Sequence, residues 1–360
     1  MLRNEINPDK FKLYDDPNEI FKAMLNDIQH AEIYIYIETY KFGNDSVARS
    51  FRDGLTEKAK EGIKVKLLID SWGTAVGMSF FSELIKSGGE VRFFEKLVFT
   101  FDFFTRNHRR DHRKLLLIDD RVSYIGSTNF TEYSLNWREL VLRLQSEITI
   151  PLKKIFLQNR RLFDKYIYDK IFYTRLMKYK DFEILRDIPT ITIQKIMNKY
   201  VRLIKKARKE ILIETPYFLP GKKFRKALAD AAERGVNVKV IIPKNSDVRV
   251  IDLLRNRYLG FLNEKKVEIL FYAPGNLHAK TLMIDKEYFS IGSANIDYRS
   301  FRYMHEICII GKNKSIIEQL DSHFSETIRY CIPFNHSHWI NRPLPEKFFE
   351  WILLPFRHYL

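Results

Sequence analysis

The residue types best suited to chemistry occur twice in this chain, in the same order. The stretch HRKLLLIDDRVSYIGSTN, residues 112–129, has a counterpart in HAKTLMIDKEYFSIGSAN, residues 278–295. His, Lys, Asp, Gly, Ser and Asn stand at the same six relative positions in both stretches. A lone His-x-Lys is usually part of a surface strand, but six shared identities at roughly five per cent usage each have a chance of about 10⁻⁸ per starting position. The repetition therefore indicates a duplicated functional site.

The repeated residue types favour phosphoryl transfer without a metal. Imidazole is a nucleophile and a proton donor near neutral pH, Lys supplies positive charge, and Ser and Asn donate hydrogen bonds to anionic oxygens. A phosphodiester needs a nucleophile on one side of phosphorus and an acid on the other, so one His cannot serve both. We therefore expect both copies to face one shared active site. The candidate catalytic residues are His112, Lys114, Asp119, His278, Lys280 and Asp285.

A hairpin in each copy would bring further polar residues to these groups. With two-residue turns at 120–121 and 286–287, each His faces an Asn and each Lys faces a Ser, which predicts phosphate or oxyanion binding by Ser127, Asn129, Ser293 and Asn295. The two motif Asp residues have the opposite strand parity, so we expect them to act structurally at the turns. Downstream, Glu139 and Glu306 are expected to orient the imidazoles by accepting the Nδ1 hydrogen bond. We expect no metal and no cofactor.

The similarity between the copies extends to the elements that must position them. IYIYIETYKF, residues 33–42, corresponds to ILIETPYFLP, residues 211–220, and EGIKVKLLID, residues 61–70, corresponds to RGVNVKVIIP, residues 234–243. In each half an apolar strand, a helical segment ending in Gly and a second apolar strand follow one another, which is typical of βαβ units. We therefore predict an α/β fold with two similar halves, each a mostly parallel sheet flanked by helices, related by a pseudo-twofold axis.

The boundaries follow from changes in periodicity. We predict an N-terminal half at residues 1–151, a helical connector at 152–197, a C-terminal half at 198–330 and a basic, aromatic tail at 331–360. The tail fits either an interfacial anchor on a membrane or a terminal helix docked on the core. The Phe-rich stretch FFEKLVFTFDFF, residues 93–104, fits core packing or the entrance for an acyl chain.

Composition limits the partners and the compartment. Lys plus Arg exceed Asp plus Glu by 61 − 45 = 16, which predicts attraction to nucleic acid, anionic lipid or phosphorylated substrates. No run of eighteen apolar residues and no signal-peptide pattern is present, so we expect a cytoplasmic protein associated peripherally with the membrane. Cys308 and Cys331 lack metal-ligand spacing and are interpreted as buried hydrophobes.

The repeated pattern His-x-Lys-x4-Asp-x6-Gly-Ser-x-Asn resembles the phospholipase D superfamily, and most closely its bacterial cardiolipin synthases. ETPYFLP at 214–220, AAERGVNVKVIIP at 231–243 and the segment around HAKTLMID are similar to that family's second half, and RPLPEKFFEWILLPF is similar to its C-terminal end. The resemblance implies ping-pong phosphatidyl transfer from a phosphatidylglycerol-like lipid at an anionic membrane surface. It favours His112 as nucleophile and His278 as acid and base, with the reverse left open. The alternatives are a phospholipase D-type hydrolase and a nucleic-acid phosphodiesterase.

Overall fold

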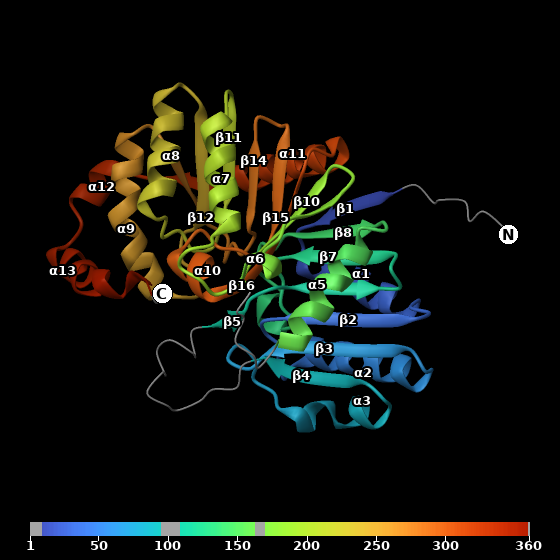
Figure 1. The fold of residues 1–360 in the computed structure, drawn as a ribbon. Helices are drawn as coiled ribbons and strands as arrows, with labels where there is room; N and C mark the ends of the chain where they lie inside the picture. The colour runs from blue at the N-terminus through green and yellow to red at the C-terminus, as the bar shows by residue number, and fades with distance from the viewer. Residues whose placement is uncertain (1–8, 95–108, 163–169, 359–360) are drawn as a thin grey trace.

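The structure is a computed structural model that describes residues 9–94, 109–162 and 170–358. Two α/β halves lie side by side (Figure 1), the N-terminal half around a seven-stranded sheet and the C-terminal half around a ten-stranded sheet. This confirms the predicted two-half α/β architecture. Residues 95–104 of the Phe-rich stretch lie outside the described residues, so the interpretation of that stretch stays a prediction.

The elements of the N-terminal half run in chain order from the first strand to the helix that leaves it. They are β1 (Lys10–Tyr14), α1 (Pro17–Gln29), β2 (Tyr34–Thr39), α2 (Ser46–Lys60), β3 (Lys64–Asp70), η1 (Met78–Phe81), α3 (Ser82–Lys86), β4 (Glu90–Phe94), β5 (Arg110–Asp111), β6 (Leu115–Ile118), β7 (Val122–Gly126), η2 (Glu132–Ser134), β8 (Val141–Gln145) and α5 (Thr149–Leu162). Seven of the strands form a sheet in the order β1-β8-β7-β6-β2-β3-β4.

The C-terminal half repeats this plan and adds strands at its edges. Its elements are α6 (Lys170–Tyr173), β9 (Met177–Tyr179), β10 (Phe182–Asp187), α7 (Lys195–Lys206), β11 (Glu210–Glu214), α8 (Lys222–Glu233), β12 (Asn237–Pro243), α9 (Arg249–Glu264), β13 (Glu268–Tyr272), β14 (Thr281–Ile284), β15 (Tyr288–Gly292), α10 (Tyr298–Tyr303), β16 (Met304–Gly311), α11 (Lys314–Arg329), β17 (Cys331–Pro333), α12 (His336–Ile340), α13 (Leu344–Leu353) and η3 (Leu354–His358). The strand order is β17-β13-β12-β11-β14-β15-β16-β10-β9, and β5 of the other half pairs with β16.

Both sheets are mixed rather than mostly parallel. Parallel neighbours are β2-β3-β4 and β11-β12-β13, the products of the predicted βαβ units, together with the short β5-β16 pair. The motif hairpins β6-β7 and β14-β15 join the sheets antiparallel to β2 and β11. The expectation of mostly parallel sheets is wrong here because each hairpin and the strand after it extend the sheet by antiparallel pairing.

Apolar side chains pack in three layers, of which the middle one joins the halves. Helices α1 and α2 cover one face of the first sheet, and α7 and α8 cover the corresponding face of the second. Between the sheets, one continuous cluster contains residues of both halves, including Phe156 of α5, Leu320 of α11, Leu117 of β6 and Met283 of β14. This shared core fixes the two motif hairpins relative to each other.

The segment 152–197 contains strands as well as helices. Helix α5 begins before the predicted boundary at 151, and β10 pairs antiparallel with β16 from Asp187↔Glu306 to Glu183↔Ile310. The expectation of a purely helical connector is therefore wrong at β9 and β10. The physical reason is that β10 is almost entirely buried and covers the open edge of β16, where unpaired backbone groups would otherwise be exposed.

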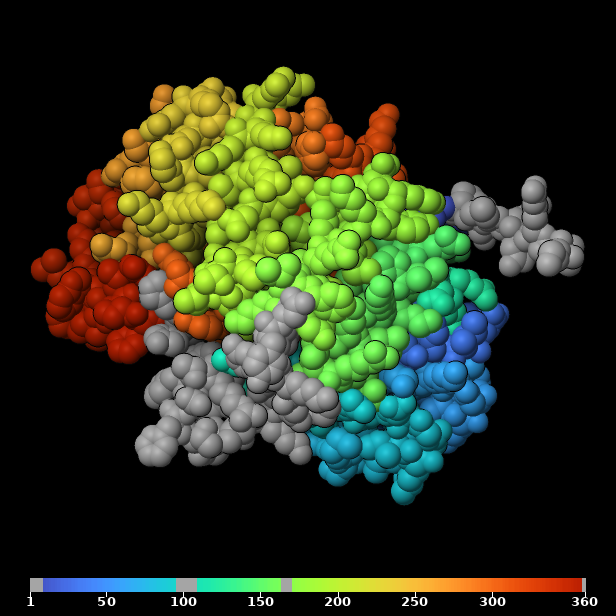
Figure 2. Space-filling view, in the orientation of Figure 1, coloured from blue at the N-terminus to red at the C-terminus, as the bar shows by residue number. Residues whose placement is uncertain are grey.

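The tail folds back on α9 and still presents an apolar face to solvent. The Trp339 indole donates to the Asn256 carbonyl at 2.7 Å, and its ring lies against Gly260, where a Cβ would collide with it. Outward-facing apolar side chains on α13 and η3 include Leu344, Phe348, Phe349, Trp351, Ile352 and Phe356, which are 41–78% exposed. In the space-filling view this segment forms a red protrusion at the left edge of the molecule (Figure 2). No helix in the described part of the chain is long and apolar enough to cross a membrane.

Candidate active site

The motif Asp residues set the geometry of the hairpins. Each carboxylate accepts three backbone N–H bonds: Asp119 from residues 32–34 at 2.7–2.8 Å, and Asp285 from residues 208–210 at 2.7–2.9 Å. Both Asp residues have φ of 54° and stand outside the ladder, so Ile118 pairs with Val122 and Ile284 with Tyr288. The predicted two-residue turns are therefore wrong by one residue. The expected structural role of the two Asp residues agrees with these contacts.

The motif glycines are required by close approach of the backbone. A Cβ on Gly126 would collide with the carbonyl of Leu140 in the next strand, and a Cβ on Gly292 would collide with that of Ile307. Both glycines lie at the ends of motif strands, where the chain turns towards the Ser and Asn of the motif. Any larger residue would push β8 or β16 away, and with it the Glu that each of these strands positions.

The two motif histidines are oriented by carboxylates from opposite halves. Nδ1 of His112 lies 3.0 Å from Oε1 of Glu306, and Nδ1 of His278 lies 2.9 Å from Oε1 of Glu139. All four side chains are buried. Since the carboxylate fixes the proton on Nδ1, Nε2 of each imidazole is left for chemistry. The sequence singled out these carboxylates, but it did not reveal that the pairs cross between the halves.

The motif serines hold the carboxylates. Ser127 donates to Glu139 and Ser293 donates to Glu306, and their oxygens accept the N–H groups of Leu140 and Ile307 at 2.9 and 3.1 Å. A hydroxyl has one proton to donate, and each is committed to a carboxylate. The expectation that these serines donate to phosphate is therefore wrong for this geometry.

The asparagines and histidines instead line one cavity of about 330 Å³. Its lining residues come from both halves and include Tyr40, Lys41, Trp72, His112, Asn129, Tyr133, Tyr217, Asp247, His278, Asn295, Arg299 and Met304. The Oδ1 atoms of Asn129 and Asn295 are buried and have no hydrogen-bond partner among the described residues. Beside the histidines, the Nζ atoms of Lys114 and Lys280 each donate at 2.8 Å to the backbone carbonyl of the His two residues earlier. Two oriented imidazoles thus line the cavity, and the two lysines are buried beside them, behind its lining.

Burial perturbs the pKa values of the motif lysines and histidines. It lowers the pKa of Lys280 to about 7 and that of Lys114 to about 8, although Glu139 and Glu306 oppose the shift. Burial, reinforced by both lysines, holds the pKa of His112 well below its usual range, whereas the smaller lowering of the His278 pKa is opposed by Glu139. Burial therefore disfavours the charged forms of these lysines and histidines, and an anionic substrate beside them would favour those forms.

The two carboxylates that orient the histidines differ in pKa. Burial raises the pKa of Glu306 to about 7, and the contacts from Ser293 and Lys114 offset this only in part. For Glu139 the opposing effect of burial is outweighed by His278, Lys280 and Ser127, so its pKa lies below the usual value. The His278–Glu139 pair is consequently better suited than the His112–Glu306 pair to hold a proton on the imidazole.

Comparison with known proteins identifies this arrangement. A family model described as "Cardiolipin synthase, PLD-like domain", where PLD stands for phospholipase D, matches residues 24–166 and 200–328, which include both motifs. The chain belongs to this family of the phospholipase D superfamily. It is 31% identical over 358 residues to a cardiolipin synthase of Clostridium perfringens, with 91% of this chain and 71% of that protein covered. It is 32% identical over 357 residues to cardiolipin synthase 1 of Staphylococcus epidermidis, with 95% and 72% covered.

Solved structures confirm the phospholipase D-like fold at low sequence identity. A phosphatidylserine synthase of Haemophilus influenzae superposes with a TM-score of 0.77 at 12% identity, covering 97% of this chain and 95% of that one. A polyphosphate kinase of Porphyromonas gingivalis superposes with a TM-score of 0.65 at 12% identity, covering 97% and 53%. Among the described residues, no group of three or more His, Cys, Asp or Glu side chains is placed to hold a metal ion.

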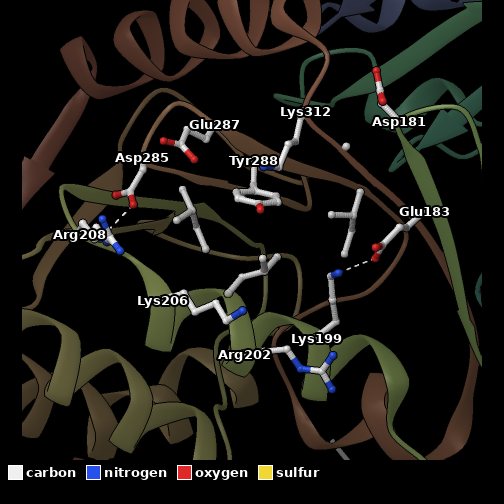
Figure 3. Close-up of a pocket in the computed structure, with 14 residues that line it drawn as sticks. Asp181, Glu183, Lys199, Arg202, Lys206, Arg208, Asp285, Glu287, Tyr288 and Lys312 are labelled. Carbon is white, nitrogen blue, oxygen red and sulfur yellow. Dashed lines mark hydrogen bonds and ion pairs between the residues drawn. The ribbon is translucent and has the colours of Figure 1, made fainter.

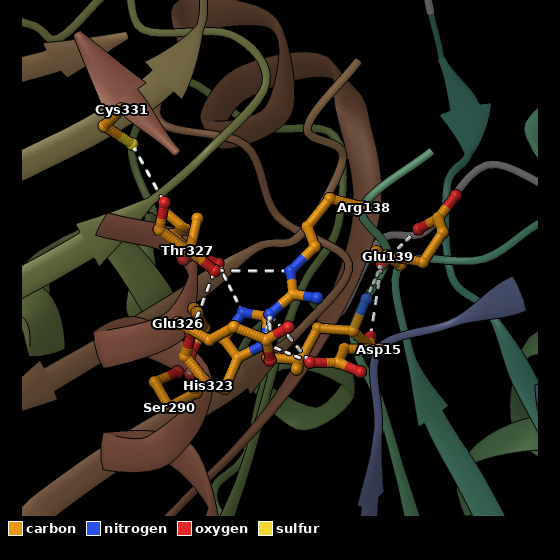
Figure 4. A network of polar contacts seen from close by, with 12 residues as sticks. Asp15, Arg138, Glu139, Ser290, His323, Glu326, Thr327 and Cys331 are labelled. Carbon is orange, nitrogen blue, oxygen red and sulfur yellow. Dashed lines mark hydrogen bonds and ion pairs between the residues drawn. The ribbon is translucent and has the colours of Figure 1, made fainter. Parts of the chain in front are cut away.

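Another buried histidine, His323, joins the halves of this phospholipase D-like chain near the site (Figure 4). Nδ1 of His323 lies 2.8 Å from Asp15 and Nε2 lies 2.7 Å from Glu214, so one imidazole links the N-terminal and C-terminal halves. Burial lowers its pKa, but the two carboxylates outweigh this and raise the pKa to about 9. Arg138 contacts Asp15 at 2.9 Å and Glu326 at 3.2 Å in the same network.

Arg138 also connects this network to the His278–Glu139 pair. Its carbonyl accepts the backbone N–H of His278 at 2.7 Å, and the next residue along the chain is Glu139. In the other half, the carbonyl of His305 accepts the N–H of His112 at 3.0 Å, just before Glu306. The residue before each carboxylate therefore fixes the backbone of the histidine that the carboxylate orients. The charged network around His323 supports this contact only on the His278 side.

Sequence reasoning missed several cavity residues of the phospholipase D-like site, namely Lys41, Tyr133, Tyr217, Asp247 and Arg299. None of them belongs to the six shared identities. A difference between the two copies could have indicated two of them, because the offset of 166 residues that aligns the motifs places Tyr133 at the position of Arg299. Positions that break the repeat inside a shared cavity distinguish its two sides.

A separate cavity of about 610 Å³ lies at the turn of the β14-β15 hairpin, at the far end of β14 from His278 (Figure 3). Its lining is strongly charged, but Lys199 pairs with Glu183, and the carboxylate of Asp285 accepts the Arg208 backbone N–H at 2.9 Å. Lys312 lies over the Tyr288 ring at 4.3 Å. None of its described lining residues is a His or a Cys, whereas two histidines line the first cavity.

Proposed function

We propose that this protein is a phosphatidyltransferase that makes cardiolipin from phosphatidylglycerol through a phosphatidyl-histidine intermediate. The observation that carries the proposal is the single cavity in which His112 and His278, each held at Nδ1 by a buried carboxylate, are accompanied by Lys114 and Lys280. Two imidazoles with free Nε2 atoms suit in-line displacement at phosphorus. The names of the relatives support a phospholipid as the substrate.

In the first step, Nε2 of His112 attacks phosphorus and the P–O bond to the glycerol headgroup breaks. His278 enters this step as the imidazolium, and its Nε2 gives its proton to the departing glycerol oxygen. In the second step, the hydroxyl of a second phosphatidylglycerol gives its proton to His278 as its oxygen attacks phosphorus, and the P–N bond to His112 breaks. The two lysines neutralise the negative charge on the non-bridging oxygens of the phosphate. His112 is regenerated as a neutral imidazole.

The assignment of His112 as the nucleophile is supported by the difference between the two pairs. Attack requires an unprotonated Nε2, and the pKa of His112 lies well below its usual range because of burial and the neighbouring lysines. Proton transfer requires an imidazole that readily carries charge, and Glu139, whose pKa is lowered, favours that on His278. The reverse roles would use the imidazole that is harder to protonate as the acid.

Access to the lipid is proposed to come from the tail. Its exposed side chains at Leu344, Phe348 and Trp351 are of the apolar and aromatic type that enters the headgroup region of a bilayer. Leu353 at the end of α13 packs on a cluster that contains Ile251 and Val248, and both of these residues also line the active-site cavity. Contact of the tail with a membrane would therefore bring the mouth of the cavity to the lipid surface, as a peripheral association.

The test is mass spectrometry of the lipids formed from phosphatidylglycerol vesicles by the purified protein in EDTA. Cardiolipin is the expected product, and His112→Ala and His278→Ala should each abolish its formation while the circular dichroism spectrum is unchanged. Phosphatidic acid as the sole product would make the protein a hydrolase. Unchanged lipid, together with cleavage of DNA by the same preparation, would establish the phosphodiesterase alternative and refute the proposal.

A further inference from the structure

Two cations outside the repeated motif line the active-site cavity, one from each half. Lys41 follows β2, and its Nζ lies 4.1 Å from the centroid of the Tyr133 ring. Arg299 lies in α10, and its Nε and Nη2 atoms are buried without a hydrogen-bond partner among the described residues. Lys41 forms no ion pair among the described residues either; the Asp247 carboxylate, which accepts the hydroxyl of Tyr217 at 2.8 Å, acts on it only at longer range.

In the alignment of the two halves, each of these two cations corresponds to a tyrosine in the other half. The shared Glu-Thr pairs align Lys41 in ETYKF with Tyr217 in ETPYF, and the motif offset aligns Tyr133 with Arg299. At these two aligned positions each half therefore contributes one cation and one tyrosine to the lining of the cavity, in opposite order. The reacting groups are duplicated with little change, whereas the residues around them differ between the two sides.

The two cations lie beside different histidines. The ring of Tyr133 contacts Trp137 with centroids 4.8 Å apart, and Trp137 contacts the His278 imidazole at 5.2 Å. Lys41, over Tyr133, is thus at the end of a continuous row of side chains that begins at His278. Arg299 lies close enough to His112 to contribute to the lowering of its pKa.

The chemistry gives the cation beside His278 a specific task. In-line displacement places the entering alcohol on the face of phosphorus opposite to His112, which is the side of His278. When that alcohol is phosphatidylglycerol, it carries a second phosphodiester three carbons from the attacking oxygen. Lys114 and Lys280 are occupied by the reacting phosphate, so the second anion needs another partner.

We propose that Lys41, held over Tyr133, binds the phosphodiester of the acceptor lipid and so favours an anionic phospholipid over a neutral alcohol as acceptor. This inference rests on the proposed phosphatidyl transfer. An ammonium that is half-buried and free of an ion pair gains most from such an anion, because little existing contact is lost. Arg299, on the side of His112, then binds the donor lipid, whether the acceptor is an anionic phospholipid or a neutral alcohol.

The experiment measures two products of one intermediate. The purified protein is given phosphatidylglycerol in mixed micelles with deuterated glycerol, and the ratio of cardiolipin to deuterated phosphatidylglycerol is measured by mass spectrometry. Both products come from the same phosphatidyl-enzyme, so effects on the donor step cancel in the ratio. Lys41→Gln should lower the ratio about tenfold, the effect of one lost charge-assisted contact. Lys41→Arg should restore most of it.

Matched controls separate this effect from a general loss of charge. Lys12 lies over the Tyr14 ring at 4.4 Å on β1, away from the cavity, so Lys12→Gln should leave the ratio unchanged. Arg299→Gln should reduce both products together. Tyr133→Leu, which removes the ring beneath Lys41, should lower the ratio as well, and it provides the test if Lys41→Gln does not fold.

The outcomes distinguish this inference from the proposed function. If the wild-type protein makes cardiolipin and Lys41→Gln keeps the wild-type ratio, the acceptor site is wrong and the transferase stands. If the wild-type protein makes no cardiolipin, the proposed function is wrong, and the acceptor site falls with it. A ratio that also falls in Lys12→Gln would refute the assignment to Lys41.

Discussion

The lowered pKa values of the two active-site lysines predict a steep alkaline limit for capture of an anionic substrate. Burial leaves Lys280 with a pKa of about 7 and Lys114 with a pKa of about 8. Each ammonium is charged below its pKa and neutral above it. A phosphodiester binds best when both are charged, so kcat/KM, which reports the free enzyme, should fall as pH rises through this range.

The magnitude follows from the two values. At pH 7 about half of Lys280 and about nine-tenths of Lys114 are charged, whereas at pH 9 the fractions are about 1 and 9 per cent. The doubly charged form therefore falls about 500-fold between pH 7 and 9, and the slope of log kcat/KM approaches −2. A bound phosphate about 4 Å away would raise each pKa by roughly three units at an effective dielectric constant near 20, so kcat should stay level to higher pH.

The assay is initial-rate kinetics in zwitterionic mixed micelles from pH 5.5 to 9.5 at constant ionic strength with EDTA. Lys280→Arg is the matched variant, because a guanidinium stays charged throughout, and the slope of its alkaline limb should approach −1. A wild-type kcat/KM that is level up to pH 9 would refute the reasoning. A parallel fall of kcat and kcat/KM would also contradict it, since bound phosphate should protect the lysines.

Three further predictions concern other parts of the chain. The pKa of His323 is raised to about 9 from 6.5, so its charge stabilises the fold fully below pH 6.5, and about 3 kcal/mol of that stability is lost as pH rises through 9. The unfolding free energy of His323→Gln, measured in urea, should lack this loss. Parallel plots of unfolding free energy against pH for the wild type and the variant would contradict the prediction. With a p-nitrophenyl phosphatidyl donor, whose leaving group needs no proton, Glu139→Gln should accumulate phosphatidyl-enzyme, whereas Glu306→Gln should form it about 10- to 100-fold more slowly. Intact-protein mass spectrometry measures the phosphatidyl-enzyme in both variants. Equal rates of formation and equal accumulation would refute the crossed roles. Phe348→Glu with Trp351→Glu should weaken co-sedimentation with phosphatidylglycerol vesicles at least tenfold and reduce activity on detergent-dispersed lipid much less, and equal losses would indicate that the tail only packs on the core.

The sequence predicted the residue types of the site better than their spatial relations. Duplicated identities were enough to find His112 and His278, and the periodicity upstream was enough to predict the βαβ units. The hairpin register failed because it depends on Asp119 binding backbone groups more than eighty residues away, which no local pattern encodes. Likewise, β10 is a strand because β16 offers it an edge, a condition set by the folded sheet.

A different reason explains why the crossing of the Glu–His pairs could not be predicted. Glu139 and Glu306 occupy equivalent places in the two copies, and sequence alone does not distinguish a pair within a copy from a pair between copies. The answer lies in the shared core, where side chains such as Leu117 and Met283 set the docking of the halves. Cavity residues such as Arg299 were missed because they break the repeat that drew attention to the motif.

The crossed pairing also says something about how such a chain could have arisen. In the folded chain each imidazole pairs with the carboxylate of the other half, and two identical halves docked in this way would complete both pairs at once. An ancestor of one half would then have been active only as a dimer, at a rate limited by its own concentration. Fusion replaces that bimolecular encounter by a tether with a high effective concentration. It also lets the two sides mutate separately, which an obligate homodimer never can.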